Sequence, residues 1–169
     1  MDSQNSSSRY ALDASAFYAG TPFLSSAVSY YCTTQAILDE VKHIKKSHGA
    51  IEALSAAGNL EIIDPGKSSI EKVKAAAKKT GDYRKLSQAD VSIIALALQL
   101  ETTLLTDDYA VANVASALKI PVKSSSGKGI KETRKWISYC SACGKAFGPE
   151  AKECPLCGNK LRRKYRVTS

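Results

Sequence analysis

The sequence predicts an α/β protein, in which a parallel sheet flanked by helices is followed by a small C-terminal zinc ribbon. Short apolar runs alternate with amphipathic runs over residues 1–122, and this alternation is typical of a parallel sheet covered on both faces. Two Cys-x-x-Cys pairs near the end of the chain have the spacing of a structural zinc site. With 169 residues, 44% of them hydrophobic, the chain can bury one core and still carry a small module.

Five runs rich in strand-forming residues are predicted strands, and the amphipathic runs between them are predicted helices. Gly58 and Asn59 end one of these helices, as helix-terminating residues commonly do. The predicted strands lie at 9–13, 29–34, 60–64, 102–107 and 120–123. The predicted helices lie at 14–19, 34–46, 51–57, 68–79, 87–101 and 109–119.

Composition divides the chain into four segments, and the charge is unevenly distributed among them. Residues 1–122 carry 12 Lys and Arg against 13 Asp and Glu, whereas residues 123–169 carry 12 against 3. A basic end of this kind predicts a polyanionic partner such as nucleic acid. The predicted segments are a disordered N-terminus (1–8), an α/β domain (9–122), a Ser/Gly/Lys-rich linker (123–135) and a ribbon with a basic tail (136–169).

The N-terminal sequence and the hydropathy predict no membrane partner. No apolar run reaches the roughly 18 residues of a membrane span, and the first residues are polar. We therefore expect a reducing, cytoplasmic location.

The four paired cysteines are predicted to bind one structural Zn²⁺. Ten residues separate the two pairs, enough for a short hairpin, and a glycine follows each pair where the backbone must turn tightly. Two disulfides are the alternative, which the expected reducing location disfavours. Cys32 is left over and is predicted to be a small buried residue of a strand. The predicted zinc ligands are Cys140, Cys143, Cys154 and Cys157.

Acidic residues follow two of the predicted strands, and parallel strands place their carboxyl ends at one edge of the sheet. Asp13 follows the first strand, and Asp107 and Asp108 follow the fourth. Glu40 is spaced to share a helix face with apolar residues, and Asp90 begins another helix. Each acid has a structural alternative, since Asp13, Asp107 or Asp108 could cap a helix and Asp90 fits a capping box. Taken together, converging carboxylates predict a Mg²⁺ or Mn²⁺ site able to activate water at a phosphate.

Three long strings resemble the Nob family (Nin-one-binding proteins), a group of PIN-domain nucleases. They are TGDYRKLSQADVSIIALALQLE, LLTDDYAVANVASAL, and GIKETRKWISYCSACGKAF followed by CPLCGNKL. The resemblance covers nearly the whole chain after residue 8, and the compact length is similar to archaeal members. It implies a PIN-like fold and a metal-dependent endoribonuclease that trims the 3′ end of pre-16S rRNA in the small ribosomal subunit precursor, with assembly-factor proteins as possible partners.

The resemblance also implies roles for the acids. Asp13, Asp90 and Asp108 would hold Mg²⁺ or Mn²⁺, and Glu40 would be a ligand or position the water. Asp107 remains an alternative to Asp108, although the usual Thr-x-Asp pattern favours Asp108. Hydrolysis would leave 3′-OH and 5′-phosphate ends. Two other functions stay open: an RNA-binding assembly factor with little cleavage, and a toxin-type PIN ribonuclease, which the ribbon disfavours.

The basic C-terminal region is predicted to contact RNA phosphates. Phosphate contacts provide affinity and position but little choice of sequence. The predicted RNA-binding residues are Lys128, Lys131, Arg134, Lys135, Arg162, Arg163 and Lys164.

Overall fold

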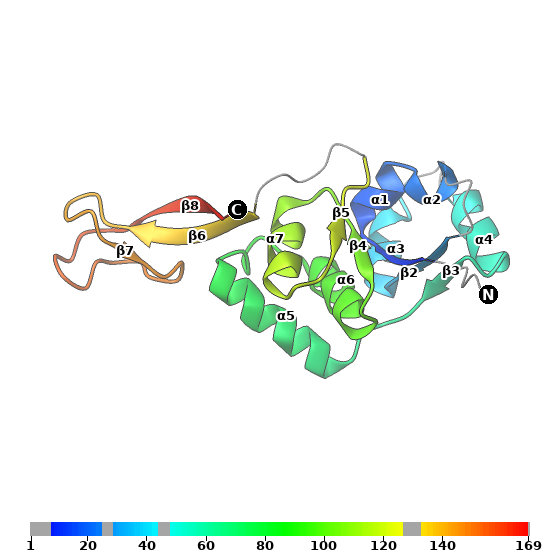
Figure 1. Ribbon diagram of the computed structural model, residues 1–169, viewed down its shortest axis with the longest axis horizontal. Helices are drawn as coiled ribbons and strands as arrows, with labels where there is room; N and C mark the ends of the chain where they lie inside the picture. Colours follow the sequence, from blue (N-terminus) through cyan, green and yellow to red (C-terminus); the bar gives the residue numbers. More distant parts are fainter. Residues whose placement is uncertain (1–7, 25–28, 44–47, 127–132, 169) are drawn as a thin grey trace, which may run out of the picture.

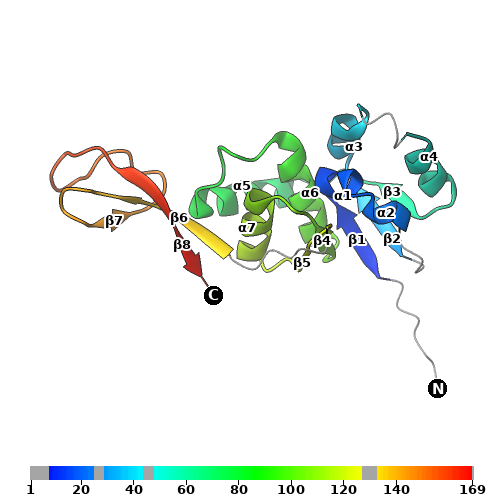
Figure 2. The same ribbon diagram turned by 90° about the horizontal axis from the view of Figure 1, so that it is seen from above.

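The structure is a computed structural model that describes residues 8–24, 29–43, 48–126 and 133–168. It is elongated, with a helix-flanked sheet in one part of the molecule and a small second sheet extending from it (Figure 1). The view from above shows the same division (Figure 2). In the described part of the chain, no helix is long and apolar enough to cross a membrane.

The first sheet is five-stranded and parallel throughout, as the sequence predicts. Its strand order is β3-β2-β1-β4-β5. The chain therefore builds one half of the sheet outward from β1 and then returns to build the other half from β4. Such a reversal leaves a crevice at the carboxyl ends of the two central strands, where α/β proteins bind ligands. The strands are β1 (Arg9–Leu12), β2 (Tyr30–Thr33), β3 (Leu60–Ile62), β4 (Thr103–Leu105) and β5 (Val122–Lys123).

The helices between these strands confirm the predicted alternation. The second helix, TPFL, was not predicted, because four residues with a proline near the start give too little periodicity to recognise. The helices are α1 (Ala14–Tyr18), α2 (Thr21–Leu24), α3 (Gln35–Val41), α4 (His48–Ala56), α5 (Lys67–Thr80), α6 (Gln88–Gln99) and α7 (Tyr109–Ala117).

The core lies between the sheet and α6, whose residues from Val91 to Ala97 are almost all buried. Cys32 is fully buried in β2, as predicted. Ser87 accepts the N–H of Asp90, and the Asp90 carboxylate accepts the N–H of Ser87, so the predicted capping box is confirmed. This cap fixes where α6 begins and thereby where the Asp90 carboxylate lies.

The second sheet is antiparallel and belongs to the C-terminal segment. It consists of β6 (Thr133–Tyr139), β7 (Ala146–Phe147) and β8 (Arg162–Thr168), in the order β7-β6-β8. β6 begins at Thr133, three residues before the predicted start of the ribbon, and it packs against α5 and α7. The predicted disordered residues 1–7 and most of the predicted linker, residues 127–132, lie outside the described residues.

Candidate active site and zinc ribbon

Asp13 and Asp108 are joined through the hydroxyl of Thr106, at the carboxyl ends of β1 and β4. The pairing of Leu12 with Leu105 brings the two strand ends together. Thr106 Oγ1 donates to Asp13 Oδ2 at 2.6 Å and accepts the N–H of Asp108 at 3.0 Å. Both Asp13 and Thr106 are buried. The predicted convergence of acids from distant positions is thus present for this pair.

Both aspartates also cap helices, so the structural alternative is true as well. Asp13 Oδ1 accepts the N–H of Ala14 at 2.8 Å and begins α1. Asp108 Oδ1 accepts the N–H groups of Ala110 and Val111 and begins α7. A capping bond occupies one carboxylate oxygen and orients the group, which leaves further acceptor capacity on each carboxylate.

Glu40 and Asp90 are linked through Ser87. The hydroxyl of Ser87 lies 3.5 Å from Glu40 Oε1, and its N–H donates to Asp90 Oδ2 at 2.7 Å. The expectation that Glu40 lies on the buried face of its helix is wrong: Ile37 and Val41 are fully buried, but Glu40 is exposed. At about 100° per residue, position 40 falls at the border of the apolar stripe rather than within it.

Asp107 is directed away from this group. Its Oδ1 accepts the hydroxyl of Ser124 at 2.6 Å and the N–H of Ser125 at 3.0 Å. Its own N–H donates to Ser15 Oγ at 3.0 Å, and that hydroxyl in turn lies 3.3 Å from Asp13 Oδ2. The side chain of Asp107 therefore fastens the segment after β5 to the end of β4.

The electrostatics of the acids are those of like charges held close together. Burial raises the pKa of Asp13 to about 6; hydrogen bonds from Thr106 and Ala14 oppose the shift, and the charges of Asp90 and Asp108 add to it. Burial and the charge of Asp90 likewise raise the pKa of Glu40. Among the described residues, no Lys or Arg forms an ion pair with any of these four acids.

These oxygen donors fit a hard divalent cation. Mg²⁺ and Mn²⁺ prefer carboxylate oxygens, and a bound cation would relieve the mutual repulsion of Asp13, Asp90 and Asp108. Among the described residues, the carboxylates are not gathered as tightly as the cysteine ligand atoms of the ribbon. Binding would therefore draw them closer together or use water between them and the ion.

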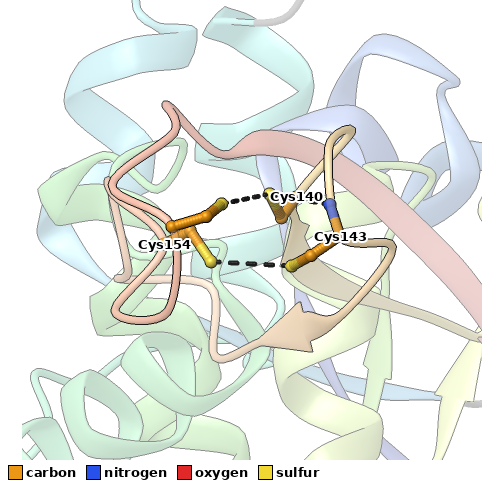
Figure 3. Close-up of side chains that lie close together, drawn as sticks. Cys140, Cys143 and Cys154 are labelled. Atoms are coloured by element: carbon orange, nitrogen blue, oxygen red, sulfur yellow. Dashed lines mark hydrogen bonds between the residues drawn. The ribbon is translucent and has the colours of Figure 1, made fainter.

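The four predicted zinc ligands converge in the ribbon. Their sulfur atoms all lie within 4.8 Å of one another, and two pairs are separated by 3.4 and 3.7 Å (Figure 3). A tetrahedron with Zn–S bonds of about 2.3 Å has edges of about 3.8 Å, so the spacing fits Zn²⁺. The N–H of Cys143 donates to Cys140 Sγ and lowers the pKa of Cys140 to about 6, which favours the thiolate needed for a metal bond.

The predicted RNA-binding residues of the ribbon are divided between the two faces of its sheet. Side chains alternate along a strand, so Arg163 shares a face with Trp136 and Ser138. Lys135, Arg162 and Lys164 lie on the opposite face, where the Lys164 ammonium is 4.5 Å from the ring centre of Tyr139. Lys128, Lys131 and the side chain of Arg134 lie outside the described residues.

Arg163 holds the ribbon against the α/β domain. Its guanidinium donates to the carbonyl of Gly81, at the end of α5, and lies 5.2 Å from the ring centre of Trp136. Lys85 places its ammonium 3.8 Å from the same ring. Arg163 was predicted only to bind RNA, but it also joins the two parts of the protein. Side chains alternate between the two faces of β8, so Arg163 lies on the face that meets the α/β domain.

Beside this joint lies a basic cleft of about 190 Å³ between the ribbon and the segment after α5. Its walls include Glu150 and four cations drawn from both parts of the chain. Such a concentration of positive charge is suited to a phosphate group. The four cations are Arg84, Lys152, Lys160 and Arg163.

Two polar side chains, Ser15 and Asp82, make supporting contacts that the sequence does not predict. Ser15 links Asp13 to the backbone of Asp107; its place two residues after Asp13, in the first turn of a helix, was the available signal. Asp82 is 1% exposed and accepts the side-chain N–H of Asn113 at 3.0 Å, which ties the segment after α5 to α7. No local pattern reveals that second contact, because 31 residues separate the partners.

Comparison with known proteins agrees with the fold and the site. The model of the family described as the PIN domain of ribonuclease matches residues 11–100, more than half of the chain. Endoribonuclease Nob1 of Pyrococcus abyssi is 37% identical over 132 residues, covering 77% of this chain and 81% of that protein. Endoribonuclease Nob1 of Methanocaldococcus jannaschii is 36% identical over 156 residues, covering 90% and 76%. The 20S-pre-rRNA D-site endonuclease NOB1 of Saccharomyces cerevisiae is 36% identical over 89 residues, covering 53% and 19%.

The parallel sheet and its acid-lined edge, together with the family match, define a PIN-domain ribonuclease. PIN-domain nucleases use divalent metal ions, in agreement with the carboxylate donors described above. The match to the Methanocaldococcus jannaschii protein covers 90% of the chain, which is more than the part that forms the parallel sheet and its helices. The chain belongs to the Nob1 family of PIN-domain endoribonucleases.

Proposed function

We propose that this chain is a divalent-metal-dependent endoribonuclease that cuts the precursor of the small-subunit rRNA at its 3′ end. The observation that supports this most directly is the group of Asp13, Asp90 and Asp108, in which the charges of Asp90 and Asp108 act on the buried Asp13 and no cation among the described residues is paired to any of the three. The name of the yeast relative, a 20S-pre-rRNA endonuclease, supports the substrate.

The contacts around Asp13 and Asp108 indicate how these carboxylates would hold the metal ion. Thr106 donates to Oδ2 of Asp13 and so holds this buried carboxylate in one orientation. Asp108 is favoured over Asp107 as a ligand, because Thr106 links Asp108 to Asp13 and the charge of Asp108 acts on Asp13. A Mg²⁺ or Mn²⁺ ion would supply Lewis acidity that activates water and stabilises charge on the phosphate.

Glu40 and Ser87 stand at the rim of this group. Glu40 is exposed overall, but the partial loss of water around its carboxylate and the nearby charge of Asp90 raise its pKa. A carboxylate with a raised pKa can accept a proton from an attacking water more readily than an ordinary one. We assign Glu40 to positioning or deprotonating that water. The Ser87 hydroxyl holds the Glu40 side chain toward Asp90.

The ribbon contributes binding of the RNA rather than chemistry. Four sulfur ligands would close the coordination of Zn²⁺, so the ion would act in folding alone. The exposed cations Lys135, Arg162 and Lys164 share one face and can neutralise phosphates of the precursor subunit. A ribbon fixed against the α/β domain then sets the distance between this contact and the acidic group.

A cleavage assay tests the proposal. End-labelled RNA spanning the 3′ end of small-subunit rRNA and its trailer would be incubated with the protein in Mn²⁺, Mg²⁺ or EDTA. Asp13→Asn and Asp108→Asn should each reduce the rate of cleavage by about a hundredfold or more. Asp39→Asn is the matched control, since Asp39 is an exposed acid on α3 that pairs with Lys42.

The outcomes separate the candidate functions. A single metal-dependent cut at the mature end, lost in Asp13→Asn and retained in Asp39→Asn, supports the proposal. RNA that is bound but left intact, also when supplied as the precursor particle, favours an assembly factor. Cleavage of many unrelated RNAs with no preference for the mature end favours a toxin-type ribonuclease.

A further inference from the structure

A groove of about 540 Å³ lies next to the acidic group, formed by α3, α5, the start of α6 and the segment between α5 and α6. Ligand pockets commonly measure about 300–1,000 Å³, so the groove is large enough for a small organic group. Its lining includes Ile70, Tyr83, Leu86, Ser87, Gln88 and Val91.

Ser87 connects this groove to the acids. The residue lines the groove, its N–H donates to Asp90 Oδ2 at 2.7 Å, and its hydroxyl lies 3.5 Å from Glu40 Oε1. An RNA chain whose phosphate lies at the acids therefore places a neighbouring nucleotide within reach of the groove.

The walls combine flat apolar surface with a few polar groups. Ile70, Leu86 and Val91 contribute aliphatic surface, and Tyr83, 40% exposed, contributes an aromatic ring. The amide of Gln88 offers both a hydrogen-bond donor and an acceptor at the first position of α6. A nucleobase has the matching character, since its faces stack on aromatic rings and its edge carries donors and acceptors.

The charge around the groove favours a nucleic acid as its occupant. The Lys78 ammonium lies 5.3 Å from the ring centre of Tyr83, and Arg84 follows Tyr83 directly in the chain. Lys74 lines the groove, although it also pairs with Glu71 at 3.2 Å. Cations beside an aromatic ring suit a base together with its phosphate, whereas an apolar protein segment needs no such charge.

We propose that this groove binds one unpaired nucleobase, adjacent to the phosphate that is cut, by stacking it on Tyr83. The proposal rests on the proposed function and adds a specificity site to it. The groove makes the enzyme require a base at one position, while the acids themselves act on the phosphate that every nucleotide shares.

Fluorescence of 2-aminopurine tests the stacking without any cleavage. This base analogue loses fluorescence when stacked, and it would be placed in turn at each position flanking the cut in a short single-stranded RNA, with Ca²⁺ replacing Mg²⁺. We expect quenching at one position, lost in Tyr83→Ala and retained in Tyr83→Phe. Tyr30→Ala is the matched control, since Tyr30 is 43% exposed at the opposite end of the strands.

Cleavage of an RNA with an abasic nucleotide at the quenched position gives the second readout. The abasic RNA should be cut about tenfold more slowly by the wild type. Tyr83→Ala should lose about tenfold on the normal RNA and lose nothing further on the abasic RNA. If Tyr83→Ala slows cleavage of the normal and the abasic RNA by the same factor, or if 2-aminopurine is quenched at no position, the groove does not bind a base. Neither result would contradict metal-dependent cleavage.

The two proposals therefore fail in different ways. Quenching that depends on Tyr83 in a protein that cleaves no RNA would refute the nuclease and support the groove as a base-binding site. If Tyr83→Ala alters sedimentation of the protein but leaves quenching unchanged, the groove holds a second copy of the chain and the base-binding proposal is wrong.

Discussion

The substitution Gly81→Ala should loosen the contact between the α/β domain and the ribbon, because Gly81 lies directly against Pro149 and Trp136. Its φ of +83° lies in the left-handed region, which L-residues other than glycine rarely adopt. A Cβ atom there would lie 2.6 Å from Cβ of Pro149 and 2.7 Å from Cβ of Trp136. Because both neighbours are Cβ atoms, they cannot rotate away, and the ribbon backbone itself must shift.

Gly58 provides the reference for the magnitude. It has a similar φ of +72°, but a Cβ atom there would meet nothing within 4 Å. Gly58→Ala should therefore cost only the left-handed backbone penalty, about 1–2 kcal/mol. Gly81→Ala adds an overpacking cost of about 1–3 kcal/mol, unless the ribbon detaches to avoid it. The difference in stability between Gly81→Ala and Gly58→Ala thus measures the cost of disturbing the contact between Gly81 and the ribbon.

Thermal unfolding and small-angle X-ray scattering would measure the two effects. We expect Gly81→Ala to unfold at a lower temperature than Gly58→Ala, and to have a larger radius of gyration if the ribbon detaches. Cleavage of the rRNA precursor should fall as well, because the ribbon would no longer hold RNA at a fixed distance from Asp13. Equal unfolding temperatures and equal radii for the two variants would refute the reasoning, since they would mean that Gly81 and Trp136 are not in contact.

Three further predictions concern the acids and the ribbon. Without Mg²⁺ or Mn²⁺, the raised pKa of Asp13, about 6, means that the folded state holds a proton which the unfolded state releases near pH 4. In urea titrations of the metal-free protein, the contribution of Asp13 to stability should therefore be present in full below pH 4 and fall by about 3 kcal/mol as the pH rises through 6. The difference between the wild type and Asp13→Asn isolates this contribution. Thr106→Val should lower stability by about 1–3 kcal/mol and slow cleavage, because it removes the hydrogen-bond partner of the Asp13 carboxylate and of the Asp108 N–H. Thr106→Ser should restore both the stability and the cleavage rate. Unchanged cleavage in Thr106→Val would contradict a positioning role for this hydroxyl. Removal of zinc with a chelator, or Cys143→Ser, should unfold the ribbon and weaken RNA binding at constant salt. The helical circular dichroism of the α/β part should stay unchanged. Loss of that helical signal would show that the two parts fold as one.

Much of the fold could be predicted because its signals are local. A capping box needs only Ser87 and Asp90, three residues apart, and two Cys-x-x-Cys pairs define a tetrahedral site whatever surrounds them. The alternation of strands and helices follows from residue periodicity, which persists in the fold because it decides which face is buried. The helix of Thr21–Leu24 was missed because one turn is too short to show a period.

The candidate site could be predicted only in part, because its details depend on residues far apart in the chain. The sequence by itself determined that Asp13, Asp90 and Asp107 or Asp108 follow or begin particular elements. Only the tertiary structure decided how Asp107 and Asp108 divide their roles: Asp108 caps α7 beside Thr106, whereas Asp107 turns to the backbone of Ser125.

The ribbon shows the same division. Composition determined that the C-terminal segment is basic and cysteine-rich, but it treated Arg163 and Lys164 alike. The alternation of side chains along β8 places them on opposite faces, and the pairing with β6 turns Arg163 toward Gly81. Contacts between residues 82 positions apart leave no trace in a local pattern, because they arise only when the surfaces of two distant segments meet.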